Sequence, residues 1–352
     1  MLEFKPDFAE AVQRWLAFWE QELIDRPVCV ITAPREGVPR VPPPPYMAGA
    51  REDFGPVVTQ ALEHAASLWW GGEAIPHYTP SFGPDQMAGW LGAELRFSDT
   101  ERTSWAVPCV DQWADAPPLK LDPENPWWKR MLAFLRALAE GFAGKMLVSH
   151  LDLHSNMDTL LAMQGGQKLC MEIMDHPEAI DRAMAQVRAL YAPIYEALYE
   201  AGNMGAHGTL GWVPAYHPVR TNTIQCDFAA LIGPAHFRRW ALPALEEEAA
   251  YLGHCVYHYD GPECLPHLAD ICSIKGLDCI QWTHGARNKP FIEWMDLLKE
   301  FQARGKSVWI PCDPESIKIF HRELKHNMVF YVCSARSQEE GEAVLQWLKD
   351  NT

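Results

Sequence analysis

The stretch HCVYHYDGPECLPHLADICSIKGLDCIQW (residues 254–282) holds two β-prone runs with a segment of helical period between them. The runs at 254–261 and 277–285 are short and rich in β-branched and aromatic residues, whereas 262–273 has the apolar spacing of a helix. A strand, a crossover helix and a second strand place the two strands parallel in one sheet. The stretch therefore predicts an α/β fold.

The same alternation extends through most of the chain. Further strands are predicted at 26–32, 73–83, 145–153, 204–212, 306–312 and 328–333. Helices are predicted at 55–70, 126–140, 177–201, 234–252, 290–304, 314–325 and 337–349, several of them opening with a proline or a small polar residue. Eight strands, each followed by a helix, predict a (β/α)8 TIM barrel. An open, doubly wound sheet is the alternative.

The domain organisation predicted from the sequence is one domain over residues 1–352. An amphipathic helix occupies 1–25, and two segments, at 34–54 and 84–125, are too long for simple turns. The first is proline-rich and the second carries several tryptophans. Long loops in compact domains are often lids, so we expect the helix and both loops to cap the barrel mouth.

Composition excludes several classes of protein. A formal net charge of −16 disfavours nucleic acid and anionic membrane as partners, and no apolar run is long enough to span a bilayer. The ten cysteines include no CxxC pair, and the first residues lack the pattern of a secretory signal. We expect a cytoplasmic protein with reduced thiols. The 15 tryptophans either line a ligand cleft or pack beneath the long loops.

The dyad His258 and Asp260 is the main candidate for chemistry. Residues two apart on a strand project to the same side, and these two lie at a predicted carboxyl end, where barrel active sites form. Imidazole and carboxylate both bind zinc, and Cys333, at the end of the last predicted strand, could supply a third ligand. The alternative is a hydrogen-bonded pair in which Asp260 orients His258 or caps the following helix.

The chain resembles the uroporphyrinogen decarboxylase superfamily, in particular its branch of cobalamin (corrinoid)-dependent methyltransferases. The resemblance runs from about residue 145 and is carried by NTIQCDFAALIGPAHFRRWALPAL, CVYHYDGPECLPHLADICSIKGLDCIQW, FQARGKSVWIPCDPESIKIF and FYVCSARSQEEGEAVLQWL. In that branch an H-x-C dyad and a distal cysteine hold zinc. His258 and Cys333 match this pattern, while Asp260 stands in place of the dyad cysteine. The RQAGRY segment of true uroporphyrinogen decarboxylases is absent, and RPVCVITAPREGVPR stands there instead.

The resemblance implies a metal-dependent methyltransferase. It would move a methyl group between a small methylated substrate or thiol acceptor and a corrinoid protein, with zinc on His258, Asp260 and Cys333. Two alternatives remain open: a metal-free decarboxylase or lyase in which His258 and Asp260 protonate a carboxylated substrate, and a non-catalytic protein that binds a corrinoid or tetrapyrrole. Six further polar or aromatic residues, mostly at predicted strand ends, are expected to bind substrate: His150, Asp152, His207, Asp227, Gln281 and Trp282.

Overall fold

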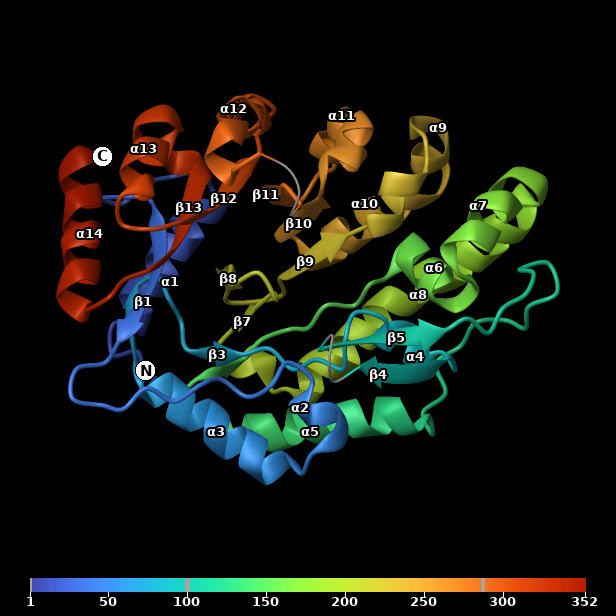
Figure 1. Cartoon of the computed structure of the whole chain (residues 1–352), viewed down its shortest axis with the longest axis horizontal. Helices are drawn as coiled ribbons and strands as arrows, with labels where there is room; N and C mark the ends of the chain where they lie inside the picture. The colour runs from blue at the N-terminus through green and yellow to red at the C-terminus, as the bar shows by residue number, and fades with distance from the viewer. Residues whose placement is uncertain (1, 99–101, 286–288) are drawn as a thin grey trace.

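The centre of the protein is a seven-stranded sheet with strand order β2-β1-β13-β12-β11-β10-β9 (Figure 1). The computed structural model describes residues 2–98, 102–285 and 289–352. Neighbouring strands are parallel except β1 and β2, which are antiparallel. The predicted α/β class is confirmed. The strands are β1 (Val28–Pro34), β2 (Leu68–Gly72), β9 (Asn222–Gln225), β10 (Cys255–Asp260), β11 (Leu277–Thr283), β12 (Ser307–Cys312) and β13 (Val329–Ser334).

The remaining strands form three short pairs. Strands β3 (His77–Tyr78) and β6 (Leu147–Val148) are parallel, whereas β4 (Glu94–Ser98) with β5 (Thr103–Val107), and β7 (Thr209–Leu210) with β8 (Tyr216–His217), are antiparallel. The predicted strands at 73–83, 145–153 and 204–212 thus shrink to two residues each. Within the described residues, the ladder of the large sheet does not continue through these short strands into a closed barrel.

Each predicted helical segment contains a helix, and α11 to α14 line the outer side of the sheet (Figure 1). The start of helix α5 is fixed by its capping residues. The side chain of Asn125 accepts hydrogen bonds from the backbone nitrogens of Trp127 and Trp128, and Pro126 occupies the first turn. Over the described ranges, no helix has the length and apolar character needed to cross a bilayer. The main helices are α1 (Phe8–Trp19), α3 (Phe54–Ala66), α5 (Pro126–Phe142), α6 (Asn156–Gln164), α7 (Gly166–Asp175), α8 (Pro177–Ala201), α10 (Leu242–Leu252), α11 (Leu268–Ser273), α12 (Met295–Ala303), α13 (Ser316–Glu323) and α14 (Gln338–Asn351).

Both faces of the sheet are buried, and alternate residues of a strand enter different cores. On β13, Val329, Tyr331 and Cys333 belong to the large core between sheet and helices. Phe330 and Val332 belong to a smaller core on the inner face. This alternation, inherent to a strand, decides which side chains can reach a site on the inner face.

Helix α1 does not cap the mouth as predicted. Its Trp15 and Phe18 pack on Phe330, with ring centroids 5.2 and 5.3 Å apart. Phe330 lies near the start of β13, so α1 covers the amino-terminal end of the strands. The apolar face that predicted the helix is buried here. Residue 1 of the predicted helix lies outside the described residues.

The two long loops contain secondary structure of their own. Segment 34–54 includes the short helix α2 (Ala48–Arg51), and segment 84–125 includes helix α4 (Gln86–Trp90) and the β4–β5 hairpin. Residues 99–101 of the second segment lie outside the described residues.

Candidate active site

Asp227, His258 and Asp260 meet at the carboxyl ends of two neighbouring strands. Gln225 on β9 lies opposite His258 on β10, and Asp227 and Asp260 each follow two residues later on the same side. One ligand atom from each of the three residues lies within 4.8 Å of the others. The period-2 spacing thus brings the two dyad residues together with Asp227.

Gln281 fixes the orientation of the His258 ring. The Nδ1 atom of His258 lies 2.5 Å from the side-chain oxygen of Gln281 on β11. Because an amide oxygen only accepts, Nδ1 carries the proton and Nε2 keeps its lone pair. Trp212 packs against the same ring in a T-shaped arrangement at a centroid distance of 5.0 Å. An imidazole held in this way presents Nε2 as a ligand or base.

A second group of donors shares Asp227 with the first. His154, Asp158 and Asp227 also place one ligand atom each within 4.8 Å of one another. His154 Nε2 lies 3.4 Å from Asp227 Oδ2. Asp158 accepts hydrogen bonds from the backbone nitrogens of Asp227 (2.9 Å) and Phe228 (2.8 Å), so it also fixes the loop after β9.

Sequence reasoning missed His154 and Asp158. Both lie in HLDLHSNMD (150–158), next to the predicted candidates His150 and Asp152. The available signal was the spacing: His154 follows Asp152 by two residues and precedes Asp158 by four, which suits a strand end running into a helix.

The site is strongly acidic. His154 faces three carboxylates: Asp85 Oδ1 at 3.7 Å, Asp152 Oδ2 at 3.9 Å and Asp227. Burial raises the pKa of Asp158 to about 7 and also raises the pKa values of Asp152 and Asp260. Within the described part of the chain, no lysine or arginine is among the main influences on these carboxyl groups. Such a site suits a cation better than an anion.

The pair His154 and Asp227 is ionic. Burial disfavours charge on both, but Asp152, Asp227 and Asp85 raise the pKa of His154 well above its usual value. Conversely, the hydrogen bond and charge of His154 lower the pKa of Asp227 despite its burial. Both shifts favour the charged forms of the two groups.

A buried glutamate supports the segment that carries His154. His154 and Asn156 have φ angles of 45° and 55°, a region that non-glycine residues rarely occupy. Glu248 Oε1 accepts hydrogen bonds from Ser155 Oγ (2.7 Å) and Asn156 Nδ2 (3.3 Å). Asn156 Nδ2 also donates to the Gln225 carbonyl at 2.9 Å. These contacts tie the 154–156 segment to β9 and α10.

Three of the predicted substrate-binding residues lie at the site. Asp227 and Gln281 contact His154 and His258 as described, and Asp152 accepts a hydrogen bond from the backbone of His154 at 3.1 Å. Tyr46, in the proline-rich loop, lies close enough for Asp152 to influence its hydroxyl pKa, which burial chiefly raises. This loop therefore reaches the site.

His150 and Trp282 do not face the site. His150 is fully buried, stacks on Tyr195 at 4.0 Å and lies 3.0 Å from the Asn222 amide nitrogen. Burial lowers its pKa to about 4, which fits a neutral core histidine. Trp282 packs on Trp294 in the core between sheet and helices, because it follows the inward-facing Gln281 by one residue.

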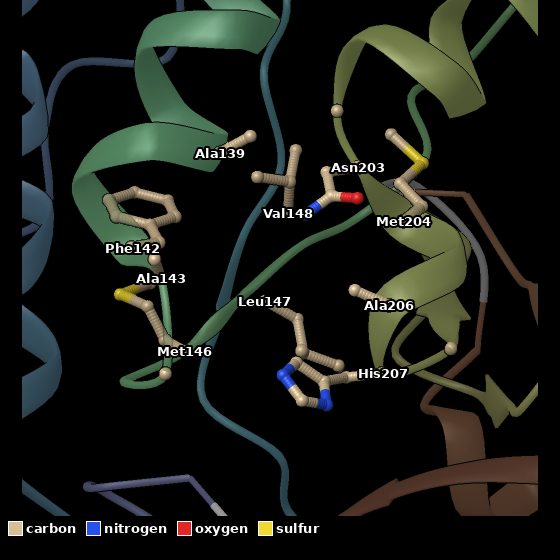
Figure 2. A pocket seen from close by; sticks show the side chains of 13 residues that line it. Ala139, Phe142, Ala143, Met146, Leu147, Val148, Asn203, Met204, Ala206 and His207 are labelled. Atoms are coloured by element: carbon tan, nitrogen blue, oxygen red, sulfur yellow. The ribbon is translucent and has the colours of Figure 1, made fainter.

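His207 lies at the other end of the strands. It precedes β7 and lines a small cavity of about 100 Å³ together with residues at the start of β6. Figure 2 shows it beside Leu147 and Ala206. Ligand pockets are usually about 300 Å³ or larger. The structure therefore separates His207 from the acidic site.

Cys333 does not join His258 and Asp260. It lies in the core between sheet and helices and pairs in register with Cys312 on β12. The inward-facing positions of β13 are its neighbours in sequence, so the thiol points to the opposite side of the sheet from the dyad. The predicted set of His258, Asp260 and Cys333 is therefore not assembled, and Asp227 lies beside the dyad instead.

Comparison with known proteins gives a likeness of fold. No protein-family model and no curated protein matches the chain. Among solved structures, a methyltransferase from Methanosarcina mazei is similar, with 14% sequence identity and a TM-score of 0.59. The likeness covers 97% of this chain and 98% of that one. Nearly the whole chain therefore shares its overall fold with that methyltransferase.

Proposed function

We propose that the protein is a metal-dependent methyltransferase that moves a methyl group between a small methylated substrate or thiol acceptor and a corrinoid protein. The observation that carries the proposal is the convergence of Asp227, His258 and Asp260 at the carboxyl ends of β9 and β10. In α/β folds this edge of the sheet is where ligands bind. We also propose that the large sheet and the short strands β3, β6 and β7 form the wall of one barrel-like domain.

The donor set fits a divalent cation. One imidazole nitrogen and two carboxylates suit zinc, and they also suit manganese or cobalt because no soft thiolate is among them. Asp227 Oδ1 is buried and has no hydrogen-bond partner among the described residues, as expected for an oxygen prepared for a ligand. When bound, the cation supplies Lewis acidity that favours the deprotonated form of a thiol or hydroxyl.

The residues of the chain supply position and charge. Gln281 keeps the proton on His258 Nδ1, which leaves Nε2 directed to the cation or to the substrate. His154 lies 3.4 Å from Asp227 and helps to hold that carboxylate beside His258. Tyr46 of the proline-rich loop lies near Asp152 and His154 and can contact a substrate at this side of the site.

The charge of the site favours this reading over a decarboxylase of carboxylated substrates. Asp85, Asp152, Asp158, Asp227 and Asp260 would repel an anionic substrate unless they were neutralised. A bound cation supplies that neutralisation.

Methyl transfer tests the proposal directly. Zinc-loaded protein should catalyse transfer between methylcobalamin and a small thiol, followed by the change in the cobalt absorption spectrum. Chelation, or the substitution Asp260→Asn, should reduce the rate by about 100-fold or more, because several kcal/mol of charge stabilisation are removed. Unchanged turnover in fully chelated protein, or no turnover with any methylated compound or thiol in protein that holds its metal, would refute it.

A further inference from the structure

The two donor groups share one residue. Asp227 belongs to both the His258–Asp260 group and the His154–Asp158 group, and each group supplies one imidazole and two carboxylates. A carboxylate has two oxygens and about four lone-pair positions, so one aspartate can serve two cations.

Each imidazole has a side-chain oxygen on the Nδ1 side of its ring. His258 presents Nδ1 to Gln281, and His154 presents Nδ1 to Asp85 Oδ1 at 3.7 Å and Nε2 to Asp227. An oxygen behind one ring nitrogen and the ligand position before the other is the usual arrangement of metal-binding histidines. In both groups an oxygen therefore lies beside Nδ1 of the histidine, and a cation at the second group would replace the proton that His154 Nε2 shares with Asp227.

Buried polar atoms without partners lie next to the shared residue. Gln225 is only 4% exposed, and its amide nitrogen lies 3.4 Å from Asp227 Oδ2. Its side-chain oxygen and Asp227 Oδ1 have no hydrogen-bond partner among the residues that the structure describes. Since buried polar atoms are nearly always paired, these two oxygens point to a bound group that satisfies them.

We infer that the site holds two divalent cations bridged by Asp227, one on His258 and Asp260 and the other on His154 and Asp158. In two-metal enzymes the ions lie about 3.5–4 Å apart, a separation that a bridging carboxylate spans. Two cations would also offset most of the charge of the five carboxylates at this site. The inference rests on the proposed function for its first cation and adds the second.

The competing explanation is structural. Asp158 fixes the backbone of Asp227 and Phe228, and His154 is ion-paired with Asp227. If these were their only roles, replacing His154 would leave the number of bound cations unchanged.

Metal counting separates the two explanations. Full-length protein is loaded with Mn²⁺, freed of excess ion and analysed for metal per chain and by electron paramagnetic resonance. We expect two equivalents and an exchange-coupled signal in the wild type, and one equivalent with an uncoupled signal in His154→Asn. Asparagine is chosen because it tolerates the positive φ at this position. Asp158→Asn, which keeps one of the two oxygens that accept from the backbone of Asp227 and Phe228, should likewise hold one.

His207→Asn is the matched control because this histidine lies at the other end of the strands, and it should retain two equivalents. One equivalent in the wild type, unchanged in His154→Asn, overturns the second site and leaves the proposed function standing. Two equivalents of metal in both the wild type and His154→Asn would show that the second cation binds somewhere other than at His154, and would overturn the proposed position of the second site. No bound metal in the wild type overturns both proposals. If circular dichroism shows His154→Asn unfolded, Asp158→Asn decides between the same outcomes.

Discussion

Replacing Glu248 by glutamine should flatten the dependence of stability on pH. Glu248 is 3% exposed, and burial raises its pKa from the ordinary value of 4.5 to about 8. Between these two values the folded chain holds a proton that the unfolded chain has lost. Stability therefore falls as pH rises through this window.

The expected magnitude follows from the two pKa values. One proton held only by the folded state changes the free energy of unfolding by about 1.4 kcal/mol per pH unit. Because the folded group is already half ionised near its own pKa, the loss between pH 6 and pH 8 amounts to about 2 kcal/mol. Glutamine keeps the acceptor for Ser155 and Asn156 but cannot ionise, so this part of the loss should disappear.

The assay is urea unfolding of chelator-treated protein at several pH values from 5.5 to 8.5. Glu247→Gln is the matched control because Glu247 is the adjacent residue, exposed and paired with Arg188 at 2.8 Å. The difference in unfolding free energy between wild type and Glu248→Gln should change by about 2 kcal/mol between pH 6 and pH 8. Parallel pH profiles for wild type and Glu248→Gln would show that Glu248 is not protonated in the folded chain.

Three further predictions concern the metal. Cys333→Ser should leave the metal content unchanged, because the thiol lies beside Cys312 on the face of the sheet opposite to the dyad. Elemental analysis measures the metal content, and a loss of metal would show that the thiolate is a ligand. Gln281→Leu should weaken zinc binding by about 10- to 100-fold, since it removes the acceptor that orients His258, and competition with a chromophoric chelator measures this; equal affinity would contradict it. Removing a cation held at 100 times its dissociation constant should cost about 2.7 kcal/mol of stability, visible as a lower melting temperature on adding EDTA; an unchanged melting temperature would argue against binding to the folded state.

Much of the secondary structure could be predicted because the spacing of apolar residues along the sequence reflects which side of a helix or strand is buried. The long amphipathic segments became α3, α5, α8 and α14, and the apolar runs became β1 and β10 to β13. Strand β9 escaped prediction because it carries polar residues on both sides: Asn222, Thr223 and Gln225 are all buried, and Ile224 is the one apolar residue among its four. No apolar pattern marks such a strand.

The site was predictable only in part. The pairing of His258 with Asp260 follows from period 2. The fold brings His154 and Asp158 to them from the segment that leads into α6, about 100 residues earlier in the chain. Cys333 was expected as a ligand from its place at a strand end, but strands buried on both sides read as continuous apolar runs, so the sequence pattern does not tell which face its thiol occupies. Gln281 and Trp282 are adjacent on one strand, and adjacent side chains on a strand point to opposite faces. Only one of the two could therefore face the site, and predicting both was inconsistent with this alternation.

Anomalous X-ray diffraction from crystals grown with zinc tests the central claim most directly. The account predicts a zinc peak about 2.0–2.2 Å from His258 Nε2 and from carboxylate oxygens of Asp227 and Asp260. A peak at the sulfur atoms of Cys333 and Cys312, or no peak at the carboxyl ends of β9 and β10, would contradict it.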